Sequence, residues 1–193
     1  KHPLGLIRGL AQQITDSDEA GADSKEKATE IMQEADVAVD RLGDFMLYAK
    51  TKSPDKRPVD LKASVERVTK LLRPEFDAAG VHLELSLSPT TINADEEMLS
   101  RVVVNLLNNA LRACDGQGTV RISGDASEWR ITDDGCGIPA GLLPEIFKPY
   151  VTGQPDGHGI GLAIVKRIVD EHGWQIRVES TENEIGRASC RER

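Results

Sequence analysis

Two glycine-rich stretches carry residues whose types and spacing could bind a nucleotide. Residues 133–139 read Asp-Asp-Gly-Cys-Gly-Ile-Pro and follow an apolar-patterned segment, residues 129–132, that is typical of a strand. A carboxylate at a strand end can accept a hydrogen bond from an amino group such as that of adenine, and alternate glycines let a ligand lie against bare backbone. Residues 156–162 read Asp-Gly-His-Gly-Ile-Gly-Leu and precede an apolar helical run, whose first N–H groups can bind phosphate. One stretch can therefore hold a base and the other a polyphosphate.

A third set of polar residues lies on one face of a helix that is predicted to start at Asp95. Arg101, Asn105, Asn109 and Arg112 follow one another at steps of four, four and three residues, so they share a face opposite the leucine and valine side chains. A carboxamide oxygen is a neutral hard ligand that suits Mg²⁺, which keeps waters and phosphate oxygens as its other ligands. An ordinary solvated helix face would also explain these residues, but the poor helix propensity of asparagine weakens that interpretation.

Taken in order, these motifs resemble the N, G1, F and G2 boxes of histidine-kinase ATP-binding domains, a family related to the Hsp90-like, MutL-like and gyrase-like ATPases. The resemblance covers roughly residues 58–180. It rests on Asn105-Leu106-Leu107-Asn108-Asn109-Ala110, Asp133-x-Gly135-x-Gly137, Phe147 and Gly157-x-Gly159-x-Gly161-Leu162. The sequence contains no Gly-x-x-x-x-Gly-Lys-Ser/Thr loop, so it does not support a P-loop fold.

The resemblance implies roles for individual residues. Asp133 matches the carboxylate that binds adenine, and the two glycines after it let the backbone close over the base. Asn109 matches the residue that holds Mg²⁺, and Asn105 matches one that supports the same site. Arg112 matches a basic residue that contacts phosphate. The implied cofactors are therefore ATP and Mg²⁺.

The segment Phe147-Lys148-Pro149-Tyr150 matches the start of the lid that covers ATP in the family, and Tyr150 is expected to pack there. The residues that follow, 152–156, are of the small and polar types that suit a mobile loop ordering on ATP. The predicted nucleotide-binding set is Asn105, Asn109, Arg112, Asp133, Gly135, Gly137, Phe147, Lys148, Tyr150, Gly157, Gly159, Gly161 and Leu162.

Composition bounds the class of protein. Hydrophobic content of 39% and charged content of 29% suit a soluble globular chain, and an aromatic content of 4% predicts an aliphatic core. The formal net charge of −8 argues against a nucleic-acid partner. No run of 18 apolar residues is present, so we expect no membrane span within the chain. Three cysteines without a Cys-x-x-Cys motif favour reduced thiols in a cytoplasmic setting.

The N-terminal region is predicted to form a helical hairpin. Residues 4–14 read as one helix and a segment from Asp23 to Ala49 reads as a longer one. The longer helix places apolar residues at alternate steps of three and four: Ala28, Ile31, Ala35, Ala38, Leu42, Phe45 and Ala49. Such a heptad seam specifies helix-on-helix packing. The first helix can cover only part of it, so we expect a homodimer through a four-helix bundle. A single long helix packed on its own domain is the alternative.

The domain organisation follows from these segments. We predict an α+β chain with a dimerisation hairpin at residues 1–52, a linker at 53–58, and an ATP-binding α/β sandwich at 59–183 with helices on one face of an antiparallel sheet. Its elements are strands near 59, 81–87, 120–124, 128–132 and 175–179, and helices after 59, from 95, over 142–147 and over 160–171. Residues 184–193 show neither helix nor strand periodicity and resemble translated sequencing adapter, so we expect a non-native tail and an exposed sheet edge.

His2 is not expected to be the phosphorylated histidine. In the family that motif reads His-Glu-x-x-Asn-Pro-Leu or similar, and Pro3-Leu4 matches its end, so His2 takes the place of the asparagine. The acceptor would lie four residues earlier, before Lys1, so we assign no catalytic side chain within residues 1–193 and expect no autophosphorylation. The remaining histidines, His82 and His172 among them, are expected to be structural or exposed.

The leading hypothesis is the catalytic core of a two-component sensor histidine kinase. As the resemblance implies, its parent would move the ATP γ-phosphoryl group to a histidine and then to an aspartate of a response-regulator receiver domain. This core would be a cytoplasmic domain of a parent that could be anchored in the inner membrane. The alternative is an ATP-gated conformational dimer of the Hsp90 or MutL type.

Overall fold

The computed structural model describes residues 3–17, 20–49, 53–125, 127–153, 159–180 and 186–191. His2 and Gly157 lie outside the described residues. The chain divides into two compact units, residues 1–50 and 51–193. Within the described ranges, no helix combines the length and the apolar character that crossing a membrane requires.

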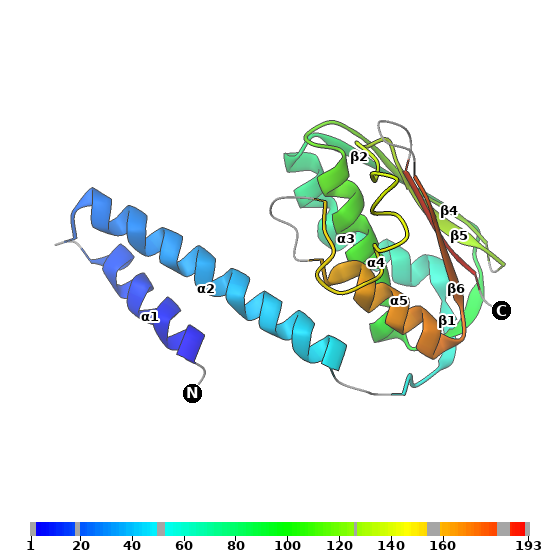
Figure 1. Ribbon diagram of the computed structural model, residues 1–193, viewed down its shortest axis with the longest axis horizontal. Helices are drawn as coiled ribbons and strands as arrows, with labels where there is room; N and C mark the ends of the chain where they lie inside the picture. Colours follow the sequence, from blue (N-terminus) through cyan, green and yellow to red (C-terminus); the bar gives the residue numbers. More distant parts are fainter. Residues whose placement is uncertain are drawn as a thin grey trace. The chain divides into compact units, whose positions relative to one another are not determined.

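The first unit is a hairpin of α1 (Pro3–Asp16) and α2 (Ala22–Ala49), which pack side by side (Figure 1). Both predicted helices are confirmed. The contact is made by small side chains: among the hairpin residues whose burial the structure describes, Ala11, Ala28 and Ala35 are buried. At the surface, Arg8 Nε donates a hydrogen bond to Asp36 Oδ1 over 2.9 Å. Alanine buries little apolar area, so one hairpin alone gains little from this contact.

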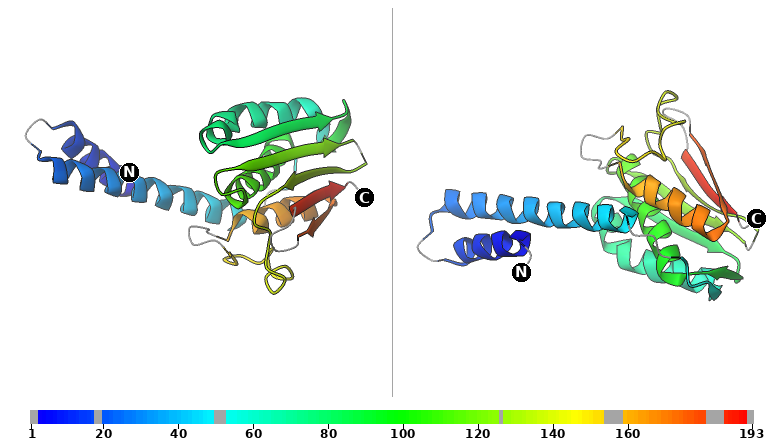
Figure 2. Two further views of the ribbon diagram at one scale, coloured as in Figure 1. Left: turned by 90° about the horizontal axis from the view of Figure 1, so that it is seen from above. Right: turned by 60° about the horizontal axis from the view of Figure 1, so that its bottom comes forward.

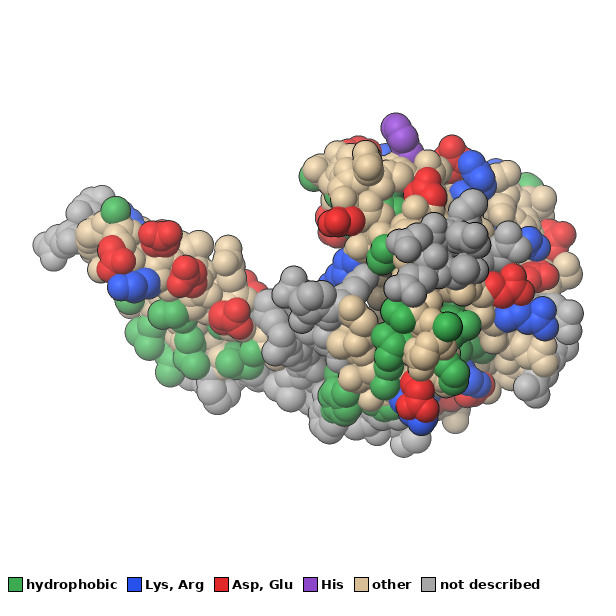
Figure 3. Space-filling model, turned by 45° about the horizontal axis from the view of Figure 1, so that its top comes forward, with side chains coloured by type: hydrophobic (Ala, Val, Ile, Leu, Met, Phe, Trp, Pro, Cys, Tyr) green, Lys and Arg blue, Asp and Glu red, His purple; other side chains and the backbone are tan. Residues whose placement is uncertain are grey.

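Larger apolar side chains of the hairpin face solvent. Figure 3 shows hydrophobic side chains gathered along one side of the hairpin and charged ones along another. Among the hairpin residues whose burial the structure describes, the exposed large apolar ones are Leu6, Ile7, Leu10, Ile14, Ile31 and Val39. The predicted heptad seam is thus divided: Ala28 and Ala35 pack in the hairpin, whereas Ile31 is 46% exposed.

The second unit is a five-stranded sheet covered on one face by three helices (Figure 2). The sheet order is β2 (Val81–Leu87), β4 (Gly118–Gly124), β5 (Trp129–Asp133), β7 (Gly186–Arg191) and β6 (Gln175–Glu179). The helices are α3 (Leu61–Ala78), α4 (Glu96–Ala113) and α5 (Gly161–His172). The predicted sandwich with helices on one sheet face is confirmed.

The core between helices and sheet is mainly aliphatic, as the low aromatic content predicts. Alternation along β2 places Val81, Leu83 and Leu87 inside and His82 outside. The largest fully buried side chains of the described residues are Phe76, Leu61, Leu99, Leu107, Ile122 and Ile164. α4 supplies two of these residues, Leu99 and Leu107, so its apolar face is anchored in the core and its polar face lies opposite.

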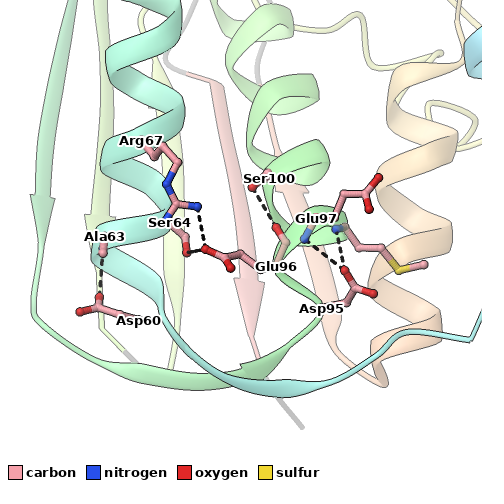
Figure 4. A network of polar contacts seen from close by, with 9 residues as sticks. Asp60, Ala63, Ser64, Arg67, Asp95, Glu96, Glu97 and Ser100 are labelled. Carbon is pink, nitrogen blue, oxygen red and sulfur yellow. Dashed lines mark hydrogen bonds and ion pairs between the residues drawn. The ribbon is translucent and has the colours of Figure 1, made fainter.

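Side-chain caps fix where α3 and α4 begin (Figure 4). Asp60 accepts from Ala63 N–H at 3.0 Å, and Asp95 accepts from Glu97 and Met98 N–H at 3.1 Å. These bonds satisfy N–H groups that have no partner within the helix. Between the two helices, Glu96 accepts from Arg67 at 2.7 Å and from Ser64 at 3.3 Å (Figure 4).

His172, at the end of α5, joins three parts of the unit. Its Nε2 accepts from Asp95 N–H at 3.0 Å and its Nδ1 donates to the Ile168 carbonyl at 2.8 Å, so the ring is neutral. The ring lies 4.3 Å from that of Trp174 and is buried. Lys56 Nζ donates to the His172 carbonyl at 2.8 Å. The prediction that this histidine is structural is confirmed.

The predicted antiparallel sheet is wrong at one pair of strands. β2 runs parallel to β4, in register from Val81 with Gly118 to Leu87 with Gly124. The connection between them contains α4, and a helical crossover is what a parallel pair requires. A further pair was not predicted: β1 (Arg57–Asp60) and β3 (Thr91–Ala94) form a separate antiparallel sheet.

The short helix predicted at residues 142–147 is also wrong. Leu142, Glu145 and Lys148 N–H groups donate to carbonyls three residues back, at 2.8 Å each, so the segment is a series of turns. Pro144 has no N–H to donate and therefore cannot continue an α-helical ladder.

The C-terminal segment corrects a third expectation. Residues 186–191 form β7, which pairs antiparallel with both β5 and β6. The sheet edge expected there is thus filled, and Cys190 is buried. Small side chains at 188–190 fit between two strands, and ladder hydrogen bonds come from the backbone whatever the side chains are. That residues 184–193 are non-native stays a prediction.

Candidate functional site

The polar face of α4 forms the floor of the candidate site. Asn105 Nδ2 donates to the Arg101 carbonyl one turn back at 2.8 Å, which fixes the carboxamide and leaves its oxygen directed away from that bond. Arg101 in turn pairs with Glu97 at 2.5 Å. Asn109 is half-buried and Arg112, in the last turn, is exposed. The predicted face thus exists as a helix face, with Asn105 as its most constrained member.

The N-terminus of α5 lies against Asn105. A Cβ on Gly161 would come within 2.7 Å of Asn105 Oδ1, so a larger residue here would displace the Asn105 carboxamide from its present position. The residue before it, Ile160, makes no side-chain cap to the helix, so no side chain there occupies the position where a phosphate oxygen could accept. Leu162 follows and is half-buried. The second glycine stretch therefore meets α4 at Asn105.

The loop after β5 packs against the C-terminal end of α4. A Cβ on Gly135 would lie 2.5 Å from the Ala113 carbonyl, and Cys136 N–H donates to the same oxygen at 2.9 Å. Gly137 has a left-handed backbone, with φ of 72°. The first glycine stretch thus meets α4 eight residues beyond Asn105, which is about 12 Å of helix rise.

Asp133 stands at the start of this loop as the last residue of β5. Its Oδ1 accepts from Gly135 N–H at 3.2 Å. Burial raises the pKa of this carboxyl, the Gly135 hydrogen bond opposes that rise, and the neighbouring Asp134 charge adds to it. Asp134 points elsewhere, since its Oδ1 accepts from Thr119 N–H at 2.7 Å. Asp133 is therefore the partly desolvated carboxylate of the pair.

The base of the predicted lid has a fixed backbone. Tyr150 N–H donates to the Gly159 carbonyl at 2.8 Å, and a Cβ on Gly159 would lie 2.6 Å from the Tyr150 backbone. Tyr150 itself has a φ of 66° and a side chain that is 67% exposed, so the expectation that it packs there is wrong. Phe147 is half-buried, and Lys148 is exposed and pairs with Glu145 at 2.6 Å.

Sequence reasoning missed two partners of the loop after β5. One is the Ala113 carbonyl, a backbone group for which side-chain patterns give no signal. The other is Ser180, whose Oγ accepts from Ile138 N–H at 2.9 Å across 42 residues. A lone serine after a strand carries no motif, so only the fold reveals it.

Two of the three cysteine thiols are buried. Burial, followed by the charge of Asp133, raises the pKa of Cys114 to about 11. Burial raises the pKa of Cys190 to about 12. All three cysteines are free, and only Cys136 is exposed. Among the described residues, no group of three or more His, Cys, Asp or Glu side chains could hold a metal ion, so a cation here would depend on carboxamides and on its ligand.

Comparison with known proteins supports the resemblance to histidine-kinase ATP-binding domains. The family described as histidine kinase-, DNA gyrase B- and HSP90-like ATPases matches residues 94–190. Sensor histidine kinase ZraS of Salmonella typhimurium (strain LT2) is 31% identical over 189 residues, covering 94% of this chain and 41% of the relative. The chain thus spans less than half of that relative.

Two solved structures share the fold. One is full-length ShkA in complex with AMPPNP, with a TM-score of 0.82 at 24% identity over 97% of this chain and 42% of that one. The other is histidine kinase ThkA in complex with response regulator protein TrrA, with a TM-score of 0.72 at 22% identity over 100% of this chain and 58% of that one. The chain belongs to the histidine kinase-, DNA gyrase B- and HSP90-like ATPases, and within them it is similar to the sensor histidine kinases.

Proposed function

We propose that this chain binds ATP with Mg²⁺ along α4 and is the catalytic core of a sensor histidine kinase. One observation carries the proposal: α4 meets a carboxylate-bearing glycine loop at Ala113 and an uncapped helix N-terminus at Asn105. These contacts support a base site beside Ala113, at the C-terminal end of α4, and a phosphate site beside Asn105, eight residues earlier. The family match and the kinase relative support the same reading.

Asp133 is proposed to accept the adenine amino group. Its partial burial excludes competing water, and Gly135 N–H keeps one carboxylate oxygen in place. Guanine presents a carbonyl where adenine presents the amino group, so a carboxylate here would repel it. Gly135 lets the loop lie directly against α4 at Ala113, and the left-handed backbone of Gly137 turns the loop after Asp133.

The phosphates are proposed to lie between Asn109, Arg112 and the N-terminus of α5, with Lys148 and Gly159 at the lid base. The donor set fits Mg²⁺, because the ion needs few protein ligands when phosphate oxygens and waters supply the rest. Asn109 would hold it, supported by Asn105, whose carboxamide is already oriented by Arg101. The bound ion would neutralise phosphate charge.

The phosphoryl transfer itself is proposed for the longer parent protein. A histidine ring nitrogen would attack the γ-phosphorus, the bond to the β-phosphate oxygen would break, and ADP would leave. The acceptor position falls upstream of Lys1 by the register of Pro3-Leu4. The phosphoryl group would then pass to an aspartate of a response regulator, and the solved complex of ThkA with response regulator protein TrrA supports a partner of that class.

The exposed apolar side of the hairpin is proposed to form a homodimer. A contiguous apolar patch on a soluble helix pair is the expected signature of an interface. Leu6, Leu10 and Ile31 are all more than 40% exposed in one chain, and a second hairpin would bury them in a four-helix bundle.

A labelling assay with γ-labelled ATP tests the proposal. The chain extended by His-Glu-x before Lys1 should acquire acid-labile label, and Asn109→Ala or removal of Mg²⁺ should abolish it. The unextended chain should stay unlabelled. Label on the unextended chain that disappears in His2→Ala would contradict the proposed register, and an extended chain that binds ATP but never labels would contradict the kinase assignment.

A further inference from the structure

The loop that follows Asp133 is held by three of its own backbone N–H groups. Gly135 N–H donates to Asp133 within the loop, and Cys136 N–H donates to the Ala113 carbonyl of α4. Ile138 N–H donates to Ser180 Oγ at 2.9 Å. Ser180 is thus the one partner of the three that joins the loop to the end of β6.

The position of this third bond gives it a specific consequence. It fixes the residue immediately after Gly137, whose left-handed φ of 72° turns the loop. Without the hydroxyl, the partly buried Ile138 N–H would lose its partner, and the turn would be free to relax. The bond from Cys136 N–H to α4 would remain, so the relaxation would be confined to the part of the loop that follows Cys136, beginning at Gly137.

We infer that Ser180 is a positioning residue for base recognition: its hydroxyl holds the turn at Gly137 and so keeps the loop shaped around the base that Asp133 selects. The inference rests on the proposed function. Ser180 acts through the backbone of Ile138, and the base-selecting atom remains the Asp133 carboxylate. Its effect should therefore appear in discrimination between bases and leave the phosphate end unchanged.

Calorimetry with ATP, GTP and ADP separates these effects. Ser180→Ala should reduce the ratio of ATP to GTP affinity about fivefold, the scale of one lost hydrogen bond, and leave the ratio of ATP to ADP affinity unchanged. Ser180→Thr, which keeps the hydroxyl, should restore the ratio. Ser127→Ala is the matched control, since Ser127 precedes β5 at the end opposite Asp133 and bonds only its own turn through Asp125.

Hydrogen exchange gives a second readout. The Ile138 amide should exchange at least about tenfold faster in Ser180→Ala, while amides of β4 and β5 keep their protection. If Ser180→Ala does not fold, the Thr and Val variants, equal in shape and different in the hydroxyl, make the same comparison.

An unchanged ATP-to-GTP ratio in Ser180→Ala, or an unchanged Ile138 amide, would overturn the inference while leaving the proposed function intact. An equal loss in the Val and Thr variants would also overturn it, because shape and not the hydroxyl would then be responsible. A wild-type chain that binds no ATP would overturn the proposed function itself.

Discussion

The helical hairpin and the nucleotide-binding unit bury apolar surface in opposite ways. In the hairpin, alanines are buried while Leu6 and Leu10 are 62% and 53% exposed. In the second unit, large residues such as Phe76 and Leu107 are fully buried. Because burial of apolar area is the main favourable term in folding, the second unit gains this term within one chain, whereas the hairpin leaves most of it unrealised and is proposed to gain it in a dimer.

Ion pairs do not remove this difference. Arg8 and Asp36 in the hairpin pair at 2.9 Å, and Arg67 and Glu96 in the second unit pair at 2.7 Å. All four side chains are about half exposed or more, and exposed pairs contribute little. The contrast therefore lies in the apolar residues.

The largest expected effect is on assembly. Leu10→Glu places a charge within the exposed apolar side of α1 and should convert the proposed dimer to a monomer while ATP still binds. Gln13→Glu introduces the same charge at an exposed polar position of the same helix and should leave the dimer intact. Light scattering measures both. A wild-type chain that is monomeric at high concentration would contradict the account of the hairpin.

The second prediction compares adjacent leucines on α3. Leu72 is 6% exposed and Leu71 is 72% exposed. Leu72→Ala should lower the free energy of unfolding by about 2–5 kcal/mol, because it leaves a cavity. Leu71→Ala should change it by less than about 0.5 kcal/mol. Urea unfolding of the chain measures both, and equal losses would show that the core is not where the structure places it.

The third prediction concerns pH. Burial, reinforced by the Lys56 charge and opposed by the Ile168 carbonyl and by Asp95 and Glu171, lowers the pKa of His172 below its ordinary 6.5. Well above pH 6.5 the ring is neutral in both states, so it adds no pH dependence there. As the pH falls further, the unfolded chain takes up a proton that the folded chain does not, and stability decreases until the folded pKa is passed.

Urea midpoints measured between about pH 7.5 and 5 test this sign. The fall toward acid should be shallower in His172→Gln than in the wild type. His82→Gln, at an exposed position on β2, should follow the wild type. Identical slopes in all three proteins would mean that His172 does not contribute.

Much of the fold could be predicted because local patterns determined it. β2 and the α4 start at Asp95 follow from strict alternation and from a capping carboxylate, and both are confirmed. The predictions that failed concern features that depend on strand pairing or on the backbone chemistry of proline. The parallel β2–β4 pair and β7 depend on partners distant in sequence, and Pro144 breaks a segment whose apolar pattern suggested a helix.

The site was predictable to a similar degree. Motif order identified Asn105, Asp133 and Gly161, and the structure places the first and last in close approach. Motif order could not indicate that Tyr150 is exposed, because this exposure depends on the backbone hydrogen bond between Tyr150 and Gly159. Ser180 was missed because its role is a single hydrogen bond to a backbone group.

The most direct test of the account is calorimetry of ATP and GTP, with Mg²⁺, on the wild type, Asp133→Asn and Asp134→Asn. ATP should bind the wild type better than GTP, and only weakly when Mg²⁺ is removed. Asp133→Asn should weaken ATP binding about tenfold or more, the scale of a lost charge-assisted hydrogen bond. Asp134→Asn makes the same chemical change at a side chain that bonds Thr119, and should bind ATP nearly as the wild type does. Equal binding of ATP and GTP by the wild type, or equal ATP binding by the wild type and Asp133→Asn, would contradict the assignment of this unit as an adenine-nucleotide site.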